Sequence, residues 1–177
     1  SDIETIDDLR GLRLATGVET SSELWLLPVT QLAEEGLDVR TDCSLIELDS
    51  TQYSDLQRWV DDRTIFEAVV NQSADAGIIF EPWLQPLTRR HGLEEGEIRI
   101  IWRTRSYAHC AFTSSPTLTE RRSDQFVDLL LSMSSDDPHI AEMMKMEHLT
   151  KWVRATDDGW SDLRKAIVEA DLVGKIY

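Results

Sequence analysis

Short apolar runs alternate with amphipathic stretches in the N-terminal part of the chain. The apolar runs are bounded by turn or capping residues and predict four strands, at Leu12–Ala15, Leu45–Leu48, Ala76–Phe80 and Ile98–Trp102. Apolar positions at helical spacing predict helices between them, at about residues 22–35, 53–59 and 63–72. Strands that alternate with helices are typical of a mostly parallel sheet with helices on both faces. We therefore expect residues 1–113 to form an α/β lobe built as a three-layer sandwich.

The pattern changes after this region. Three amphipathic helices are predicted at about residues 124–133, 139–147 and 161–170, each with a single apolar stripe. We expect residues 114–177 to be a C-terminal helical segment appended to the α/β lobe.

A run of three hydroxyl residues, Thr20, Ser21 and Ser22, separates the first predicted strand from the helix that ends at Gly36. One such residue is enough to cap a helix. A helix N-terminus also has unpaired N–H groups and a partial positive charge, and adjacent hydroxyls can donate to an oxyanion bound there. The pattern alone favours a cap with a polar loop and an anion site equally. Pro28, inside the predicted helix, predicts a kink or an irregular first turn.

The composition and the motifs exclude several classes of function. The net charge of −15 repels phosphate backbones, so we expect no nucleic-acid partner. The chain has no glycine-rich phosphate loop and no nucleophile-elbow motif, and its four histidines stand in unrelated segments. We therefore expect no cofactor, no metal site and no enzymatic activity. Cys43 and Cys110 are either two buried thiols or a disulfide, with thiols the favoured reading.

Five segments taken in order carry a resemblance to a known family: "IETIDDLRGLRLATG", "SSELWLLPVTQLAEEGLD", "FEAVVNQSADAG", "IRIIWRT" and "HLTKWVRATDDGWSDLRKAI". They resemble the phosphate/phosphonate/phosphite-binding family of ABC-transporter substrate-binding proteins. The resemblance implies a periplasmic-binding-protein fold of type II, and it covers the second lobe and the C-terminal helices without the N-terminal lobe.

The resemblance also implies which residues bind the ligand. The family's anion-binding serines fall on Ser21 and Ser22 if Pro28 sets the register, or on Thr20 and Ser21 if the register slips by one. Asp62 stands where the family often has a histidine, and Arg63 beside it is the expected nearby cation. Glu23 and Leu24 stand where the family has glycine.

Three functions remain open at this point. The first is a solute-binding protein, or its second lobe, that delivers phosphate, phosphite or a phosphonate to an ABC-transporter permease. Its location would be periplasmic or extracytoplasmic, with a lipid-anchored precursor as one form and a signal segment outside this chain. The second is a ligand-sensing domain of the same fold attached to a regulator. The third, less favoured, is an enzyme of the wider superfamily with His109 or Cys110 in its cleft. Because the C-terminal helices would normally pack on the first lobe, we also expect self-association of this chain.

Overall fold

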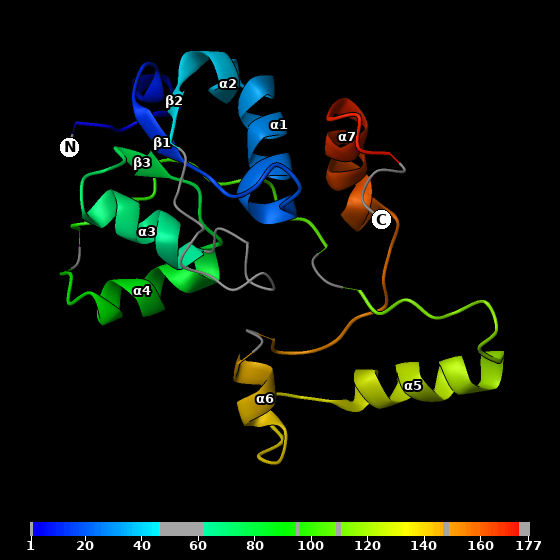
Figure 1. Ribbon diagram of the computed structural model, residues 1–177. Helices are drawn as coiled ribbons and strands as arrows, with labels where there is room; N and C mark the ends of the chain where they lie inside the picture. Colours follow the sequence, from blue (N-terminus) through cyan, green and yellow to red (C-terminus); the bar gives the residue numbers. More distant parts are fainter. Residues whose placement is uncertain (1, 47–61, 95, 109–110, 147–148, 174–177) are drawn as a thin grey trace, which may run out of the picture. The chain divides into compact units, whose positions relative to one another are not determined.

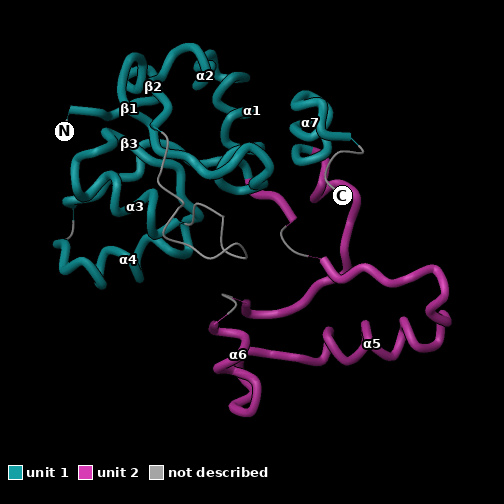
Figure 2. The backbone as a smooth tube through the Cα atoms, in the orientation of Figure 1, with its two compact units in different colours: residues 1–105, 162–177 teal, residues 106–161 magenta. Residues whose placement is uncertain are grey.

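The computed structural model describes residues 2–46, 62–94, 96–108, 111–146 and 149–173. The chain forms two compact units, unit 1 with residues 1–105 and 162–177, and unit 2 with residues 106–161 (Figure 2). Within each unit the residues contact one another more than they contact the other unit. The predicted division after residue 113, between an α/β lobe and a C-terminal helical segment, stays a prediction.

Unit 1 is built on a small parallel sheet. The central strand β1 (Arg13–Ala15) pairs with β2 (Ser44–Leu45) on one side and with β3 (Ala76–Gly77) on the other, in the order β2-β1-β3. Leu14 lies opposite Leu45 in one pair and opposite Ala76 in the other. Three predicted strands are therefore confirmed in place and are shorter than expected. Leu48, at the end of the second one, lies outside the described residues.

Helices connect these strands (Figure 1). A 3-10 turn (Ile6–Leu9) precedes β1, and a π-helical turn (Ser22–Leu26), α1 (Leu27–Glu34) and α2 (Val39–Asp42) lead from β1 to β2. The helix α3 (Asp62–Val70) leads to β3, which is followed by a 3-10 turn (Glu81–Trp83) and α4 (Leu84–Arg90). At the end of unit 2, a 3-10 turn (Asp158–Trp160) leads into α7 (Ser161–Glu169), which belongs to unit 1 from Asp162 onward. The helix predicted at 53–59 lies outside the described residues.

The core of unit 1 lies on both faces of the sheet. Leu14 and Ala15 are neighbours in β1, so their side chains point to opposite faces. Leu14 belongs to a buried cluster with residues of α1 and α7, among them Leu32 and Ala166. Ala15 belongs to a second cluster, with Ile65 of α3. Helices therefore cover both faces of a parallel sheet, as the sequence predicts.

The fourth predicted strand, Ile98–Trp102, is wrong. This segment pairs with none of the strands in the described residues. Side chains hold the segment instead. The indole Nε1 of Trp102 donates to Glu35 Oε1 over 3.0 Å, and Ile101 and Trp102 pack against the first core cluster.

Gln31 joins α1, this segment and α7. Its side chain is only 1% exposed. Its amide oxygen accepts the backbone N–H of Arg105 at 2.8 Å, and its Nε2 donates to Asp162 Oδ2 at 3.3 Å. Arg105 itself pairs with Asp162 at 2.9 Å and with Glu34 at 2.8 Å. The last predicted helix is thus fixed to the core of unit 1.

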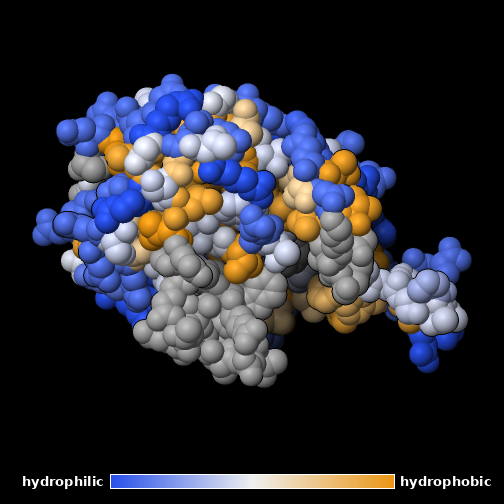
Figure 3. Space-filling view, turned by 45° about the horizontal axis from the view of Figure 1, so that its top comes forward, coloured by the Kyte–Doolittle hydropathy of each residue, from blue (hydrophilic) through white to orange (hydrophobic). Residues whose placement is uncertain are grey.

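Unit 2 contains the other two predicted C-terminal helices, α5 (Glu120–Ser132) and α6 (Ala141–Met146). No residue of α5 is buried, and the ring of Phe112, which contacts Phe126 and Trp152 at centroid distances of 5.2 Å, is 62% exposed. Large apolar side chains are exposed in unit 1 as well, and patches of them interrupt the hydrophilic surface in Figure 3. Self-association stays a prediction. No helix in the described part of the chain is long and apolar enough to cross a bilayer.

Candidate functional site

The strand order makes the connections on the two sides of β1 run over opposite faces of the sheet. The chain leaves β1 through helices on one face to reach β2, and it reaches β3, on the other side of β1, through α3 on the opposite face. In open α/β sheets, ligands bind outside the carboxyl ends of the strands where the connections diverge in this way. The residues after β1 and after β3 are therefore the candidates for a binding site.

The loop after β1 ends in a capped helix start. Ser21 is the N-cap residue, and its Oγ accepts the backbone N–H of Leu24 at 3.1 Å. The Ser21 N–H donates to the carbonyl of Val18 at 2.9 Å, which closes the turn before the helix. One of the three predicted ligand hydroxyls therefore has a structural partner already.

Pro28 explains the irregular first turn that the sequence predicts. It has no N–H, so it cannot donate to the carbonyl of Leu24, four residues earlier. The N–H of Gly17 donates to that carbonyl instead, over 3.2 Å. The N–H groups of Leu26 and Leu27 bond five residues back, so the turn is π-helical, a geometry that is frequent at functional sites.

A Cβ added at Gly17 would lie 2.4 Å from Leu24 Cβ, closer than two such atoms can approach. Only glycine fits where the loop passes the helix start. Gly17 and Ser21 together hold both ends of the loop against the helix, so the hydroxyl residues occupy a fixed position.

The hydroxyl groups of Thr20 and Ser22 differ from that of Ser21. Thr20 is exposed and Ser22 is half-buried, and neither hydroxyl has a hydrogen-bond partner among the residues that the structure describes. Ser21 Oγ also lies 3.4 Å from Glu23 Oε2, at donor distance for a weak hydrogen bond. The structure thus leaves Thr20 and Ser22 with unused donors at the helix start.

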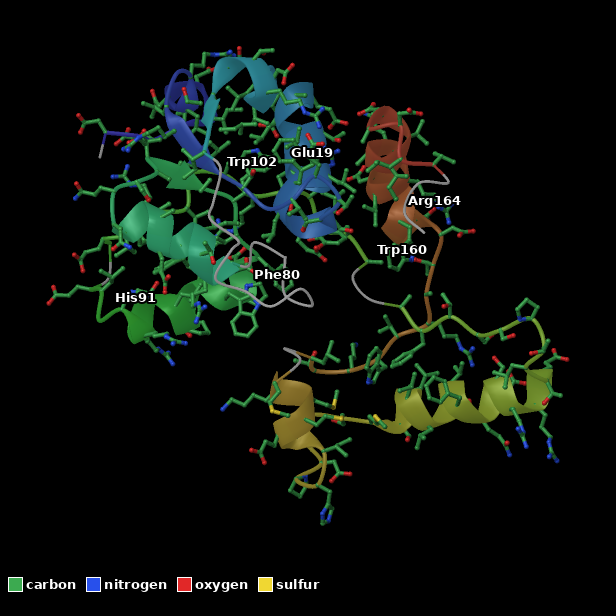
Figure 4. All side chains as sticks on the ribbon, viewed as in Figure 1. Glu19, Phe80, His91, Trp102, Trp160 and Arg164 are labelled. Atoms are coloured by element: carbon green, nitrogen blue, oxygen red, sulfur yellow. The ribbon has the colours of Figure 1, made fainter. Side chains whose placement is uncertain are left out.

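Acidic residues flank this loop. The carboxylate of Glu19 (Figure 4) pairs with Arg40 at 3.3 Å, and the Arg40 guanidinium lies 5.0 Å from the centre of the Trp25 ring. The charge of Glu19 is therefore offset by a cation that is itself held by a buried indole. Glu23, which follows the hydroxyl run directly, has its contact with Ser21.

The second predicted pair, Asp62 and Arg63, begins α3. The backbone N–H of Phe80 donates a short hydrogen bond to Asp62 Oδ1, which fixes the start of α3 to the segment after β3. Arg63 Nε lies 4.0 Å from Glu67 Oε1, and the same oxygen lies 3.6 Å from Nε2 of His91, at the end of α4 (Figure 4). Asp62 therefore has a structural contact, and Arg63 lies beside an acid–histidine pair.

The two helix starts lie at the same edge of the sheet. The loop with Ser22 follows the carboxyl end of β1 directly, and α3 begins next to Phe80, beyond the carboxyl end of β3. Leu24 and Ile65, each in the first turns of its helix, share one buried cluster. The structure thus brings together the two segments that the sequence treats as separate parts of one site.

The other chemically distinctive residues lie elsewhere in the fold or outside the described residues. Cys43 is half-buried, its Sγ lies 3.4 Å from the carbonyl oxygen of Leu9, and burial raises the pKa of its thiol. His109 and Cys110 lie outside the described residues. Within the described ranges, no three His, Cys, Asp or Glu side chains are grouped so that they could hold a metal ion.

A family model for the periplasmic phosphonate substrate-binding proteins of ABC transporters matches residues 1–160. The chain belongs to this family. No curated protein matches the chain. The family consists of transporter substrate-binding proteins and not of enzymes, so the third function considered, an enzyme of the wider superfamily, is excluded. Membership implies an extracytoplasmic location, ligand binding and interaction with an ABC-transporter permease.

Sequence reasoning missed several contacts at this edge. The bond between Phe80 and Asp62, and an ion pair between Glu81 and Arg103, join residues that are far apart in the chain. No local pattern marks such pairs. The hydroxyl run did indicate an N-cap, but not that Ser21, rather than Thr20 or Ser22, is the capping residue.

Proposed function

We propose that this protein binds a small oxyanion such as phosphate, phosphite or a phosphonate, as the solute-binding component of an ABC transporter. In this proposal unit 1 is a lobe of the type II periplasmic-binding-protein fold. One observation carries the assignment. The helix starts at Ser22 and Asp62 meet at the carboxyl edge of the sheet, where the connections run to opposite faces. The start at Ser22 has unused hydroxyl donors.

Each residue of the candidate site has a distinct role in this proposal. The hydroxyls of Thr20 and Ser22 donate to the anion, together with backbone N–H groups at the helix start. Ser21 keeps the turn in place as the N-cap, and its hydroxyl proton becomes a further donor when Glu23 turns away. Arg63 supplies positive charge, and Asp62 positions the start of α3.

The site has to act against the charge of the whole chain. A net charge of −15 repels any anion at long range, but salt screens this repulsion beyond about 8–10 Å. At short range, a hydrogen bond to a charged group contributes about 1.5–3 kcal/mol. A few aligned donors and one cation are therefore sufficient to hold a small anion.

A ligand-sensing domain attached to a regulator remains the alternative function. It would bind the same ligand at the same residues, so binding alone does not separate the two. Ligand-dependent association with an ABC permease is expected for the solute-binding component only.

Calorimetric titration of the chain with phosphate, phosphite, methylphosphonate and sulfate tests the binding site. The substitution Ser22→Ala removes one donor and leaves the cap intact, so we expect at least one of these anions to bind about tenfold or more weakly. Ser123→Ala, the same substitution in α5, is the matched control and should bind as the wild type does.

The Ser21→Ala variant tests the capping role of Ser21. It should lower stability by about 1 kcal/mol, the usual cost of a lost N-cap. Equal affinity of the wild type and Ser22→Ala for every anion would reduce the hydroxyl run to a helix cap. Absence of binding by the wild-type chain would remove the proposed oxyanion site altogether.

A further inference from the structure

An exposed arginine–carboxylate pair lies next to the candidate site. Glu81 follows Phe80, whose N–H is bonded to Asp62 at the start of α3. Its two carboxylate oxygens accept from Nε and Nη2 of Arg103 at 2.9 and 3.0 Å. The side chains are 57% and 61% exposed, so the guanidinium fork is open to solvent on its other sides. The hydrogen bonds to Arg103 lower the pKa of Glu81, which keeps the carboxylate charged.

The position of this pair is informative. Glu81 follows the carboxyl end of β3, at the edge of the sheet where the loop after β1 and the start of α3 also lie. A second pair of the same geometry joins Arg13, the first residue of β1, to Asp75, the residue before β3, at 2.7 and 3.1 Å. That pair lies at the amino edge. The chain therefore offers the same chemistry at both edges of one sheet, and only one of the pairs adjoins the candidate site.

The chemistry of the fork suits the proposed ligand. A guanidinium binds two oxygens of one group in parallel, and carboxylates and phosphate-type anions both match this geometry. Glu81 therefore presents to Arg103 the same pair of oxygens that a phosphonate would present. An anion that approaches the site competes with Glu81 for the fork.

We propose that Arg103 is a second oxyanion-contacting cation of this site, and that Glu81 is the internal competitor that holds its fork in place and limits affinity. The inference rests on the proposed function. It adds a residue that determines which anion binds, because a bidentate fork favours ligands with two adjacent charged oxygens. Release from Glu81 leaves that carboxylate charged in the site, which disfavours ligands of higher negative charge.

Calorimetric titration of the 177-residue chain with methylphosphonate and with phosphate tests this inference. Arg103→Lys keeps the charge and loses the fork, and it should bind methylphosphonate about tenfold more weakly. Glu81→Gln removes the competitor and should bind about tenfold more tightly. A structural role for the pair predicts no gain of affinity in Glu81→Gln, so this variant separates the two explanations.

Arg13→Lys and Asp75→Asn, at the opposite edge, are the matched controls. They break the same kind of pair and should leave the affinity unchanged. Wild-type affinity in Arg103→Lys, or no gain in Glu81→Gln, overturns the inference, and a loss in Ser22→Ala then shows that the proposed function still stands. A wild-type chain that binds neither anion overturns both. Circular dichroism of each variant establishes that it is folded.

Discussion

Replacing Gly17 with alanine should lower the stability of the fold, because it disturbs the contact between the loop after β1 and the helix start. The new methyl carbon would lie 2.4 Å from Leu24 Cβ and 3.1 Å from Leu24 Cδ1. Because a Cβ is bonded directly to the backbone, Leu24 cannot relieve the first contact by changing its rotamer. The loop or the helix start must move, and the 3.2 Å hydrogen bond from Gly17 to the Leu24 carbonyl lengthens.

Two costs and one gain set the magnitude of this effect. Overpacking costs about 1–3 kcal/mol, and a buried carbonyl that loses its donor costs about 1–3 kcal/mol. Alanine restricts the conformations of the unfolded chain, which stabilises the folded state by about 0.4–1 kcal/mol. The free energy of unfolding should therefore fall by about 1–5 kcal/mol, which lowers the melting temperature of a chain of this size by about 2–20 °C.

Urea denaturation followed by tryptophan fluorescence measures this change, since Trp25 is 3% exposed and adjoins Leu24. Gly92→Ala is the control. Gly92 has a φ of +65° and no neighbouring atom within 4 Å of an added Cβ, so only backbone strain of about 1–2 kcal/mol applies. Stability of Gly17→Ala equal to that of the wild type would refute the close approach of loop and helix.

Two further predictions concern the framework of unit 1. Gln31→Ala should lower the free energy of unfolding by about 1–3 kcal/mol, because it removes a buried side chain that accepts the part-buried N–H of Arg105. A change in the urea midpoint too small to measure would contradict this. The pKa of Asp75 is lowered from 3.8 to about 2, first by its hydrogen bonds to Arg13. Its stabilisation is therefore present above about pH 4 and is lost as the pH falls toward 2. With an exposed fraction of 31% the loss should be about 1 kcal/mol, and urea midpoints at neutral and acid pH should show it in the wild type but not in Asp75→Asn. An equal acid loss in both proteins would contradict the role of the pair.

Much of the fold follows from local sequence. Pro28 predicts the irregular helix start, and Gly36, with a φ of +96°, ends that helix as expected. The buried strand β1 is readable because it is short, apolar and followed by a turn. These features depend on residues within one turn of each other, so the sequence contains all the information that determines them.

The errors concern one long-range relation and one local signal. The segment 98–102 has the apolar pattern of a strand, but strand formation needs a paired neighbour, and none of the described strands pairs with it. Helix α4 was not predicted, although Pro82 before it and Gly92 after it are typical helix boundaries. The first outcome depends on what the rest of the chain places beside the segment, whereas the second has local signals at both ends of the helix.

The candidate site shows the same limit. The hydroxyl run and Arg63 were found from the sequence and from the family resemblance. The division of labour among the hydroxyls was not, because it depends on whether Ser21 is the residue that accepts from Leu24. The ion pair between Glu81 and Arg103 joins residues in different segments, and only the fold brings them together.

The most direct test of the account is the location of bound oxyanion in the chain. Methylphosphonate can be titrated into isotope-labelled protein while the backbone amide resonances are recorded by NMR. The account predicts saturable shifts for the amides of Ser22 and Glu81, at the carboxyl edge of the sheet, and none for Arg13 and Asp75 at the amino edge. Shifts centred on the amino edge, or a spectrum unchanged at high ligand concentration, would contradict it.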